Sequence, residues 1–177
     1  MNLKDRLIAL TDLETTGDIF TTHEILEIGL VLFRQDNFEI VDTFEMKVKP
    51  EHPEIFVPAA LERNGYDEEN WKDSIPLKDA MEIYSKKTKD AIFCSYNVSF
   101  DWGFMCESFK KTGVKDNMDY HRIDVMSMAF YKYIDKIESL SMSKVSQLSG
   151  IEPEEMPHRA LNGAMQGYKL YKALLEK

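Results

Sequence analysis

Cysteine, long apolar runs and net positive charge are all scarce in this sequence of 177 residues. The two cysteines, Cys94 and Cys106, are too few for a disulfide framework, so we expect small reduced thiols in a cytoplasmic protein. The longest apolar run near the N-terminus, Ile28–Phe33, is far too short to cross a bilayer. The charged start Met-Asn-Leu-Lys-Asp-Arg does not have the pattern of a signal peptide. These absences argue against a membrane protein or a disulfide-stabilised one.

Acidic residues also outnumber basic ones. Lys and Arg number 22 against 31 Asp and Glu, which gives a net charge of −9. Proteins that coat nucleic acid need basic side chains on the phosphates, so this function is disfavoured. An enzyme that holds a few nucleotides through bound cations remains compatible, because such ions reverse the local field of an acidic cleft. The acidic surface favours short or single-stranded substrates over a long duplex.

The chain shows no repeat, no low-complexity segment and no long linker, and 44% of its residues are apolar. Its length suits one compact domain, which we take as residues 1–177. Alternating and apolar segments predict five strands, and helical spacing predicts six helices. The predicted strands are Arg6–Glu14, Ile25–Arg34, Phe38–Val48, Ala91–Tyr96 and His121–Val125. The predicted helices are Ala59–Arg63, Pro76–Lys89, Ser99–Thr112, Met126–Ile134, Ser141–Leu148 and Pro157 to the end.

The boundaries of these elements carry their own signals. Short turns join the first three strands, which predicts an antiparallel meander. Ser99 is a plausible N-cap, and Gly65 and Gly113 follow the ends of two helices. The last helix has an apolar stripe of Leu161, Ala164, Met165, Tyr168, Tyr171 and Leu175. Three strands followed by alternating helices and strands indicate an α/β fold, with a mixed sheet and helices on both faces.

The first cluster that could carry chemistry is Asp12-Leu13-Glu14, at the end of the first strand. Residues two apart on a strand face the same side, roughly 6–7 Å apart along the chain. Leu13 would then point into the core. Two carboxylates on one face repel each other unless a cation lies between them. The structural alternative, a pair of exposed acids beside a turn, is favoured when the tripeptide is considered alone.

The second cluster, Asn97-Val98-Ser99-Phe100-Asp101, lies where the fourth strand gives way to a helix. Asp101 falls in the first helical turn, where the helix dipole favours an anion and no function is needed to explain it. The third cluster opens the last helix, with Pro157 near its first position and His158 next to it. A single His is usually a surface residue, although His is well suited to proton transfer near neutral pH.

Taken together, the three clusters resemble the three motifs of the DEDDh (DnaQ-like) 3′–5′ exonucleases. This group includes proofreading exonucleases, RNase T and oligoribonuclease. The order and spacing match from about Leu7 to the last helix. Three further segments agree: Thr15-Thr16-Gly17, Ile25-Leu26-Glu27-Ile28-Gly29 and Ile123-Asp124-Val125. The resemblance implies an RNase H-like fold, with a mixed five-stranded sheet made of the meander and two parallel strands.

The resemblance also implies a reaction. In such enzymes two divalent cations, Mg²⁺ or Mn²⁺, roughly 3.5–4 Å apart, grip the terminal phosphodiester. The expected substrates are 3′ ends of single-stranded DNA or RNA, and the product is a nucleoside 5′-monophosphate. The motif match assigns the metal ligands as Asp12, Glu14 and Asp101, the general base as His158, and the substrate-contacting or supporting residues as Thr15, Thr16, Asn97 and Phe100.

One position departs from the family pattern. The family has a metal-binding aspartate five residues after its histidine, and this chain has Gly163 there, preceded by the neutral Asn162. Three interpretations stay open: a folded but crippled enzyme, a member that tolerates three carboxylates or borrows another such as Asp124, and a relative that binds without catalysis. Gly163 and Gly167 lie one helical turn apart, so close approach of another backbone is a structural reason for both glycines.

Two other function classes remain in view. A binding module would hold single-stranded ends or mononucleotides in the same cleft without turnover. A polymerase-associated proofreading domain is the third possibility, but the chain ends at its last helix, which favours a free-standing enzyme or a trimmed domain. Phe100, Trp102 and Phe104 could stack on bases, although core packing is the more common role at helical spacing. The motifs do not separate DNA from RNA, and nothing in them identifies a protein partner.

Overall fold

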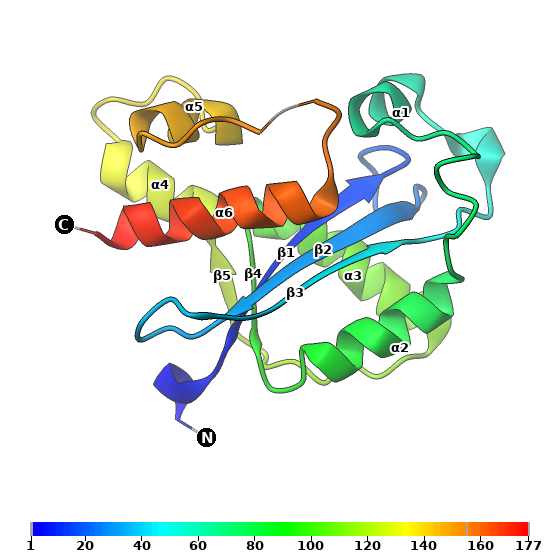
Figure 1. Ribbon diagram of the computed structural model, residues 1–177, viewed down its shortest axis with the longest axis horizontal. Coiled ribbons are helices and arrows are strands. Elements are labelled where there is room, and N and C mark those ends of the chain that lie inside the picture. Colours follow the sequence, from blue (N-terminus) through cyan, green and yellow to red (C-terminus); the bar gives the residue numbers. More distant parts are fainter. Residues whose placement is uncertain (1, 155, 177) are drawn as a thin grey trace.

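The computed structural model describes residues 2–154 and 156–176, and a five-stranded sheet forms its centre (Figure 1). The strands are β1 (Ile8–Thr15), β2 (Ile25–Phe33), β3 (Ile40–Lys47), β4 (Ile92–Ser95) and β5 (Arg122–Asp124). Their spatial order is β3-β2-β1-β4-β5, with β2 antiparallel to β1 and β3, and with β4 parallel to β1 and β5. The predicted meander with two added parallel strands is therefore confirmed.

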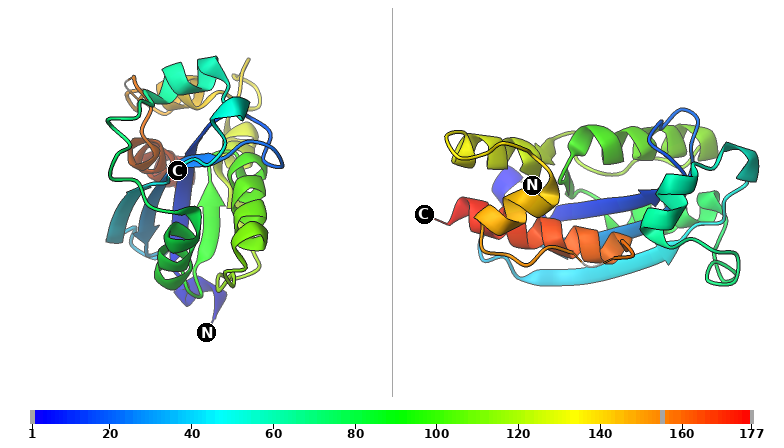
Figure 2. Two further views of the ribbon diagram at one scale, coloured as in Figure 1. Left: turned by 90° about the vertical axis from the view of Figure 1, so that its right-hand side faces the viewer. Right: turned by 90° about the horizontal axis from the view of Figure 1, so that it is seen from above.

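Helices cover both faces of this sheet. They are α1 (Pro58–Asn64), α2 (Leu77–Lys87), α3 (Val98–Thr112), α4 (Val125–Tyr133), α5 (Met142–Leu148) and α6 (Ala160–Leu175). Two short 3₁₀ turns, η1 (Leu3–Asp5) and η2 (Pro53–Ile55), precede β1 and α1. Helices α2 and α3 pack on one face and α4, α5 and α6 on the other, as Figure 2 shows. None of the helices within the described ranges is long and apolar enough to cross a membrane.

Alternate residues of β1 feed two separate cores. Ala9 and Leu13 pack with α2 and α3, whereas Ile8 and Leu10 pack with α4 and α6. This is the period of two expected for a strand buried on both faces. Leu13 is 5% exposed, so the prediction that it points into the core is confirmed. The side chains on either side of it in the sequence consequently lie on the α6 face of the sheet.

The start of α6 lies directly on β2. A Cβ atom at Gly29 would come within 2.0 Å of the carbonyl oxygen of Ala160, so only glycine permits this contact. The neighbouring strand residue Glu27 is fully buried, and its carboxylate accepts a hydrogen bond from the backbone N–H of Ala160 at 3.1 Å. The same carboxylate forms an ion pair with Arg159. This hydrogen bond and this ion pair fix the first residue of α6 against the sheet.

The predicted start of the last helix was wrong. The helix begins at Ala160, not at Pro157, and Arg159 stands at its N-cap in an extended conformation. His158 therefore lies before the helix, where its backbone N–H donates to the carbonyl of Arg63 in α1 at 2.9 Å. The helix ends at Leu175, which is 51% exposed and does not belong to the buried stripe. The predicted extension to Lys177 reaches beyond the described residues.

Other boundaries moved by one or two residues. β1 begins at Ile8 and not at Arg6, because Arg6 is the C-cap of η1, which spans Leu3–Asp5. β3 begins at Ile40, since Phe38 has a positive φ of 59° in the turn. α3 begins at Val98 with Asn97 at the N-cap, so the prediction that Ser99 caps it was wrong. The predicted glycine ends of α1 and α3 are confirmed, with left-handed φ values of 64° and 70°.

Candidate functional site

A pocket of about 170 Å³ lies at the C-terminal end of β1, where α1, α3 and the segment before α6 meet. In Figure 1 the tip of β1, α1 and the start of α6 lie close together at the upper right. The pocket is lined by Asp12, Leu13, Glu14, Thr15, Asp18, Ala60, Arg63, Asn64, Phe100 and His158. Residues from all three sequence clusters therefore converge on one cavity, although they are separated widely along the chain.

Asp12 and Glu14 enter the pocket from the same face of β1. The side chain of Glu14 is 8% exposed, and that of Asp12 is partly exposed. Burial raises the pKa of Glu14 to about 8, and the negative charges of Glu154 and Glu27 add to this effect. Burial likewise holds the pKa of Asp12 well above its usual range, with Asp101 and Glu14 as the next largest causes. The positive charges of Arg63 and Arg159 lower the pKa of Glu14, but burial and the neighbouring acids outweigh them.

Asp101, in the first turn of α3, is 4% exposed and is not among the residues that line the pocket, but its charge acts on Asp12. Burial raises its pKa to about 7. A buried first-turn aspartate would ordinarily be favoured as an anion by the helix dipole. Here the loss of solvation outweighs that gain, and loss of solvation is also the largest cause for Asp12 and Glu14. We refer to Asp12, Glu14 and Asp101 below as the motif carboxylates.

His158 reaches the pocket from the extended segment before α6, and its side chain is 39% exposed. Its Nδ1 lies 3.4 Å from Oε2 of Glu154. The other oxygen of Glu154 accepts a hydrogen bond from the backbone N–H of Arg159 at 3.1 Å. With Nδ1 directed to a carboxylate, Nε2 is the ring nitrogen left to exchange a proton with a bound molecule.

Gly163 faces Asp12 across the site. A Cβ atom at this position would lie 2.3 Å from Oδ2 of Asp12 and 2.7 Å from its Cγ. The carboxylate of Asp12 therefore occupies the space in which a side chain at 163 would begin. At Gly167 the added atom would lie 2.8 Å from Cδ2 of Leu10. Close approach is thus the reason for both glycines, but the partners are side chains of β1 and not a backbone.

Thr15 and Thr16 act mainly on the neighbouring backbone. The hydroxyl of Thr15 donates to the carbonyl of Gly17 at 2.8 Å, and the side chain of Asn64 donates to the carbonyl of Thr15. Thr16 is fully buried, and its hydroxyl accepts from the N–H of Glu24 at 2.9 Å. Thr15 lines the pocket, whereas Thr16 is not among the residues that line it. Both residues hold the turn that follows Glu14.

The other two predicted substrate residues differ from each other. Phe100 is half-buried and lines the pocket, while Asn97 is exposed and lies outside its lining. Of the remaining aromatic residues on α3, Phe104 is 2% exposed and belongs to the core, and Trp102 packs against that core. All three aromatic side chains thus contribute to core packing, and of the three only Phe100 also lines this pocket.

The residues present fit a divalent cation. All three motif carboxylates offer hard oxygen donors, the ligand type that Mg²⁺ and Mn²⁺ prefer. Loss of solvation and the charges of neighbouring acids disfavour the ionised form of all three, and a bound cation would offset this. Asp124 is not free to join them, because its two oxygens accept from the backbone N–H groups of Val98 and Ser127 at 3.0 and 2.9 Å.

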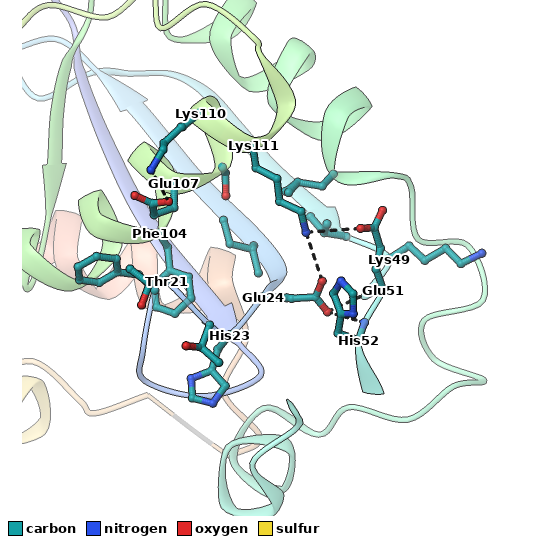
Figure 3. A pocket seen from close by; sticks show the side chains of 16 residues that line it. Thr21, His23, Glu24, Lys49, Glu51, His52, Phe104, Glu107, Lys110 and Lys111 are labelled. Carbon is teal, nitrogen blue, oxygen red and sulfur yellow. Dashed lines mark hydrogen bonds and ion pairs between the residues drawn. The ribbon is translucent and has the colours of Figure 1, made fainter. Parts of the chain in front are cut away.

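A second acidic group lies in a different pocket of about 490 Å³, shown in Figure 3. Glu24, Glu51 and His52, here called the loop cluster, bring three possible ligand atoms within 4.8 Å of one another. Within the described ranges, the motif carboxylates do not form so tight a group. The loop cluster, however, is already neutralised. Lys111 Nζ lies 3.7 Å from Glu24 and 3.4 Å from Glu51, and Glu24 also accepts from two backbone N–H groups.

Sequence reasoning missed several residues around the motif pocket. Glu27 and Arg159 were inside segments already compared with the family, yet only the structure pairs them. Arg63 and Asn64 come from α1, which had no motif to mark it. Glu154 lies in the segment between α5 and α6, and nothing in its local sequence distinguishes it from the acidic residues nearby.

Comparison with known proteins agrees with this geometry. A family model described as Exonuclease (RNase_T) matches residues 10–171. The 3′–5′ exonuclease DinG of Staphylococcus aureus (strain USA300) is 30% identical over 173 residues, which are 96% of this chain and 18% of that protein. The PolC-type DNA polymerase III of Caldanaerobacter subterraneus subsp. tengcongensis is 28% identical over 166 residues, which are 94% of this chain and 11% of that protein.

Solved structures show the same fold. Escherichia coli exonuclease I in complex with a dT13 oligonucleotide superposes with a TM-score of 0.79 at 14% identity, covering 95% of this chain and 40% of that one. The chain thus spans less than a fifth of the curated relatives above and about two fifths of this solved structure. With the family match over most of its length, the chain belongs to the DEDD-type, DnaQ-like family of 3′–5′ exonucleases.

Proposed function

We propose that this chain is a metal-dependent exonuclease that removes nucleoside 5′-monophosphates from the 3′ ends of single-stranded DNA or RNA, within one exonuclease-like domain spanning residues 1–177. One observation carries the proposal. The pocket at the end of β1 brings together His158 and two carboxylates with raised pKa values, Asp12 and Glu14, and the charge of the buried Asp101 acts on Asp12. Uncompensated buried charge beside a titratable base is typical of a catalytic site and is rarely tolerated elsewhere.

In this proposal each group of the pocket has a distinct role. Asp12 and Glu14 would hold the cations, and Asp101 would support them through its charge. When bound, the cations supply positive charge to the scissile phosphate and its leaving oxygen. Nε2 of His158 accepts a proton from the attacking water. The role of His158 is supported by its exposure and by the contact of Nδ1 with Glu154.

The terminal nucleotide has a natural place in the same pocket. Phe100 offers an aromatic face on which a base can stack, a contact that tolerates different bases. Arg63 is exposed at the pocket and its positive charge acts on Glu14, so it is suited to contact a phosphate. The narrow volume of about 170 Å³ favours a single frayed nucleotide over a duplex end.

Gly163 weakens this site without removing it. The family position that carries an aspartate offers no ligand here, so we expect weak hydrolysis that depends on high metal concentration and is relatively favoured by Mn²⁺. The test is an assay of the parent chain and Asp12→Asn on 5′-labelled single-stranded DNA and RNA oligonucleotides, with Mg²⁺ and then Mn²⁺. A ladder of products shortened from the 3′ end, present in the parent and absent in Asp12→Asn, supports the proposal.

The second candidate function is a binding module of the same fold, and the missing ligand at Gly163 is the observation that favours it. Such a module would hold a single-stranded end or a mononucleotide in the same pocket without hydrolysis. Its marker is nucleotide affinity that persists in Asp12→Asn and in the presence of a chelator. No ladder in either metal, together with metal-independent binding, would overturn the exonuclease proposal in favour of this one.

A further inference from the structure

Glu154 is an acidic residue that no motif identifies, yet it lies beside the motif pocket. It belongs to the segment between α5 and α6, and its side chain is only 10% exposed. One oxygen is held by the backbone N–H of Arg159 at 3.1 Å, and the other lies 3.4 Å from Nδ1 of His158. A carboxylate fixed in this way has a defined position relative to the site, unlike a mobile surface acid.

The charge of Glu154 reaches the metal-binding side chains. It is the largest charge effect that raises the pKa of Glu14 after burial, and it also raises the pKa of Asp12. Asp124 is the other acid considered as a substitute ligand. Both of its oxygens accept hydrogen bonds from backbone N–H groups at the N-termini of α3 and α4. Of these two acids, only Glu154 therefore adds its charge to Asp12 and Glu14 while retaining one loosely held oxygen.

The position of Gly163 explains why such a substitute is needed. Residue 163 has no side chain and Asp12 fills the space beside it, so α6 contributes no acid to the site at this position. The segment that carries Glu154 leads directly into α6 and is held at His158 by the carbonyl of Arg63. An acid on this segment approaches the pocket from the same side of the sheet as α6.

We propose that Glu154 is the fourth acidic residue of this site, in place of the aspartate that the family carries on the last helix. It completes the negative charge around the cations and positions the imidazole of His158 through Nδ1. This inference rests on the proposed metal-dependent function. It makes Glu154 a positioning residue, because its observed contacts are with His158 and with the backbone of the chain and not with a substrate.

The test compares Glu154→Gln with Glu152→Gln in Mn²⁺ binding. Glutamine keeps an oxygen that accepts from the N–H of Arg159, so the segment stays in place while the charge is lost. Glu152 is exposed on the same segment, and its substitution makes the same charge change. We expect about 10- to 100-fold weaker Mn²⁺ binding in Glu154→Gln, by titration calorimetry with nucleoside 5′-monophosphate present, and little change in Glu152→Gln.

Two further measurements separate this role from a general effect on the fold. Nitrogen-15 spectra of the His158 ring should show less of the tautomer protonated at Nδ1 in Glu154→Gln than in the parent chain. In a Gly163→Asp background, Glu154→Gln should cost less than about threefold in Mn²⁺ affinity, because the helix then supplies the acid itself.

The outcomes distinguish this inference from the proposed function. Equal Mn²⁺ affinity in Glu154→Gln and Glu152→Gln overturns the role of Glu154, while metal binding that is lost in Asp12→Asn leaves the metal site standing. An equal loss in the parent and Gly163→Asp backgrounds also overturns the replacement of the helix aspartate. If the parent chain binds no Mn²⁺ even with nucleotide present, the proposed function fails, and the role of Glu154 fails with it.

Discussion

The motif carboxylates and the loop cluster are two acidic groups with opposite electrostatic environments. Glu14 and Asp101 are buried and Asp12 is partly exposed, and loss of solvation raises the pKa of all three, with the charges of nearby acids adding to the effect. The loop cluster lies closer to solvent, has tighter spacing, and is met by Lys111 and two backbone N–H groups (Figure 3). By spacing alone, the loop cluster would be the better metal site.

The comparison shows that compensation of charge is more informative than proximity. The ammonium group of Lys111 occupies the place where a cation would serve Glu24 and Glu51. Through these two ion pairs α3 is joined to the β1–β2 loop and to the segment after β3. At the motif carboxylates, the charges of Arg63 and Arg159 lower the pKa of Glu14, but burial and the neighbouring acids outweigh them, which is a cost to the folded chain. A cost of that kind is expected where a bound ion offsets it.

The largest expected effect is the loss of function in Asp12→Asn. The amide keeps the size of the side chain but not its charge, so we expect activity to fall about 10³-fold, or roughly 4 kcal/mol of transition-state stabilisation. Stabilisation of the fold by Mn²⁺ should disappear as well. Oligonucleotide assays and thermal unfolding with and without Mn²⁺ measure the two effects. Unchanged activity would show that the motif carboxylates do not differ functionally from the loop cluster.

The next largest expected effect is that the free energy of unfolding of the metal-free chain depends on pH. Asp101 and Glu14 hold protons up to about pH 7 and 8 in the folded chain but ionise at their ordinary values, 3.8 and 4.5, when unfolded. The folded state therefore binds more protons in this window, so the free energy of unfolding falls as pH rises from about 4.5 to 8. We expect a fall on the order of 3 kcal/mol, measured by urea unfolding in the presence of a chelator.

A saturating divalent cation should reduce that fall, because it favours the ionised carboxylates. Stability that stays level or rises from pH 5 to pH 8 without metal would contradict the assignment of uncompensated charge to this pocket. A matched substitution in the loop cluster, Glu51→Gln, should leave the slope unchanged, since Glu51 is exposed and already paired with Lys111.

Glu27 is a buried acid near the site that is paired with a cation, so its removal should destabilise the fold. Glu27→Ala removes the partner of Arg159 and the acceptor for the N–H of Ala160, so we expect a loss of about 2 kcal/mol in the free energy of unfolding. Denaturant unfolding checks this value. The exposed Glu45 on β3 is the control, and its change to Ala should stay within about 0.5 kcal/mol. Equal losses would show that the Glu27 pair does not anchor α6.

Gly163→Asp should lower the stability of the metal-free chain and increase the stabilisation of the chain by Mn²⁺. The new Cβ meets the carboxylate of Asp12, which must rotate, and a further negative charge enters the pocket, so the metal-free chain should lose about 1 kcal/mol. Mn²⁺ should then raise the unfolding temperature more than in the parent chain. Gly163→Ala is the control, because it has the Cβ without the charge. The same Mn²⁺ response in both variants would show that the missing carboxylate is not what limits the site.

The smallest effect is expected at the loop cluster. Lys111→Ala removes a half-exposed lysine, so stability should change by less than about 1 kcal/mol and exonuclease activity should stay the same. The substitution also frees Glu24, Glu51 and His52, a ligand set suited to Zn²⁺. Calorimetry should detect Zn²⁺ binding that depends on His52 and is absent from the parent chain. No gain would mean that Lys111 is not what neutralises this group.

Much of the fold could be predicted because its signals are local. Alternation along β1 placed Leu13 in the core and Asp12 beside Glu14, and glycines marked the ends of α1 and α3. The start of α6 could not be predicted in this way. Pro157 and His158 have the sequence of a helix opening, but the carbonyl of Arg63 holds the backbone of His158, and the carboxylate of Glu27 caps Ala160. Tertiary hydrogen bonds overrode the local preference.

The sequence by itself determined the family, the mixed sheet and the candidate motif residues, because strand periodicity and motif spacing are properties of neighbouring residues along the chain. It also revealed the missing acid at Gly163. Only the tertiary structure decided which charges are compensated. Lys111 neutralises the loop cluster, Arg159 pairs with Glu27, and Glu154 lies beside His158. Electrostatic interactions depend on distances between segments far apart in sequence and on burial, and folding alone sets both.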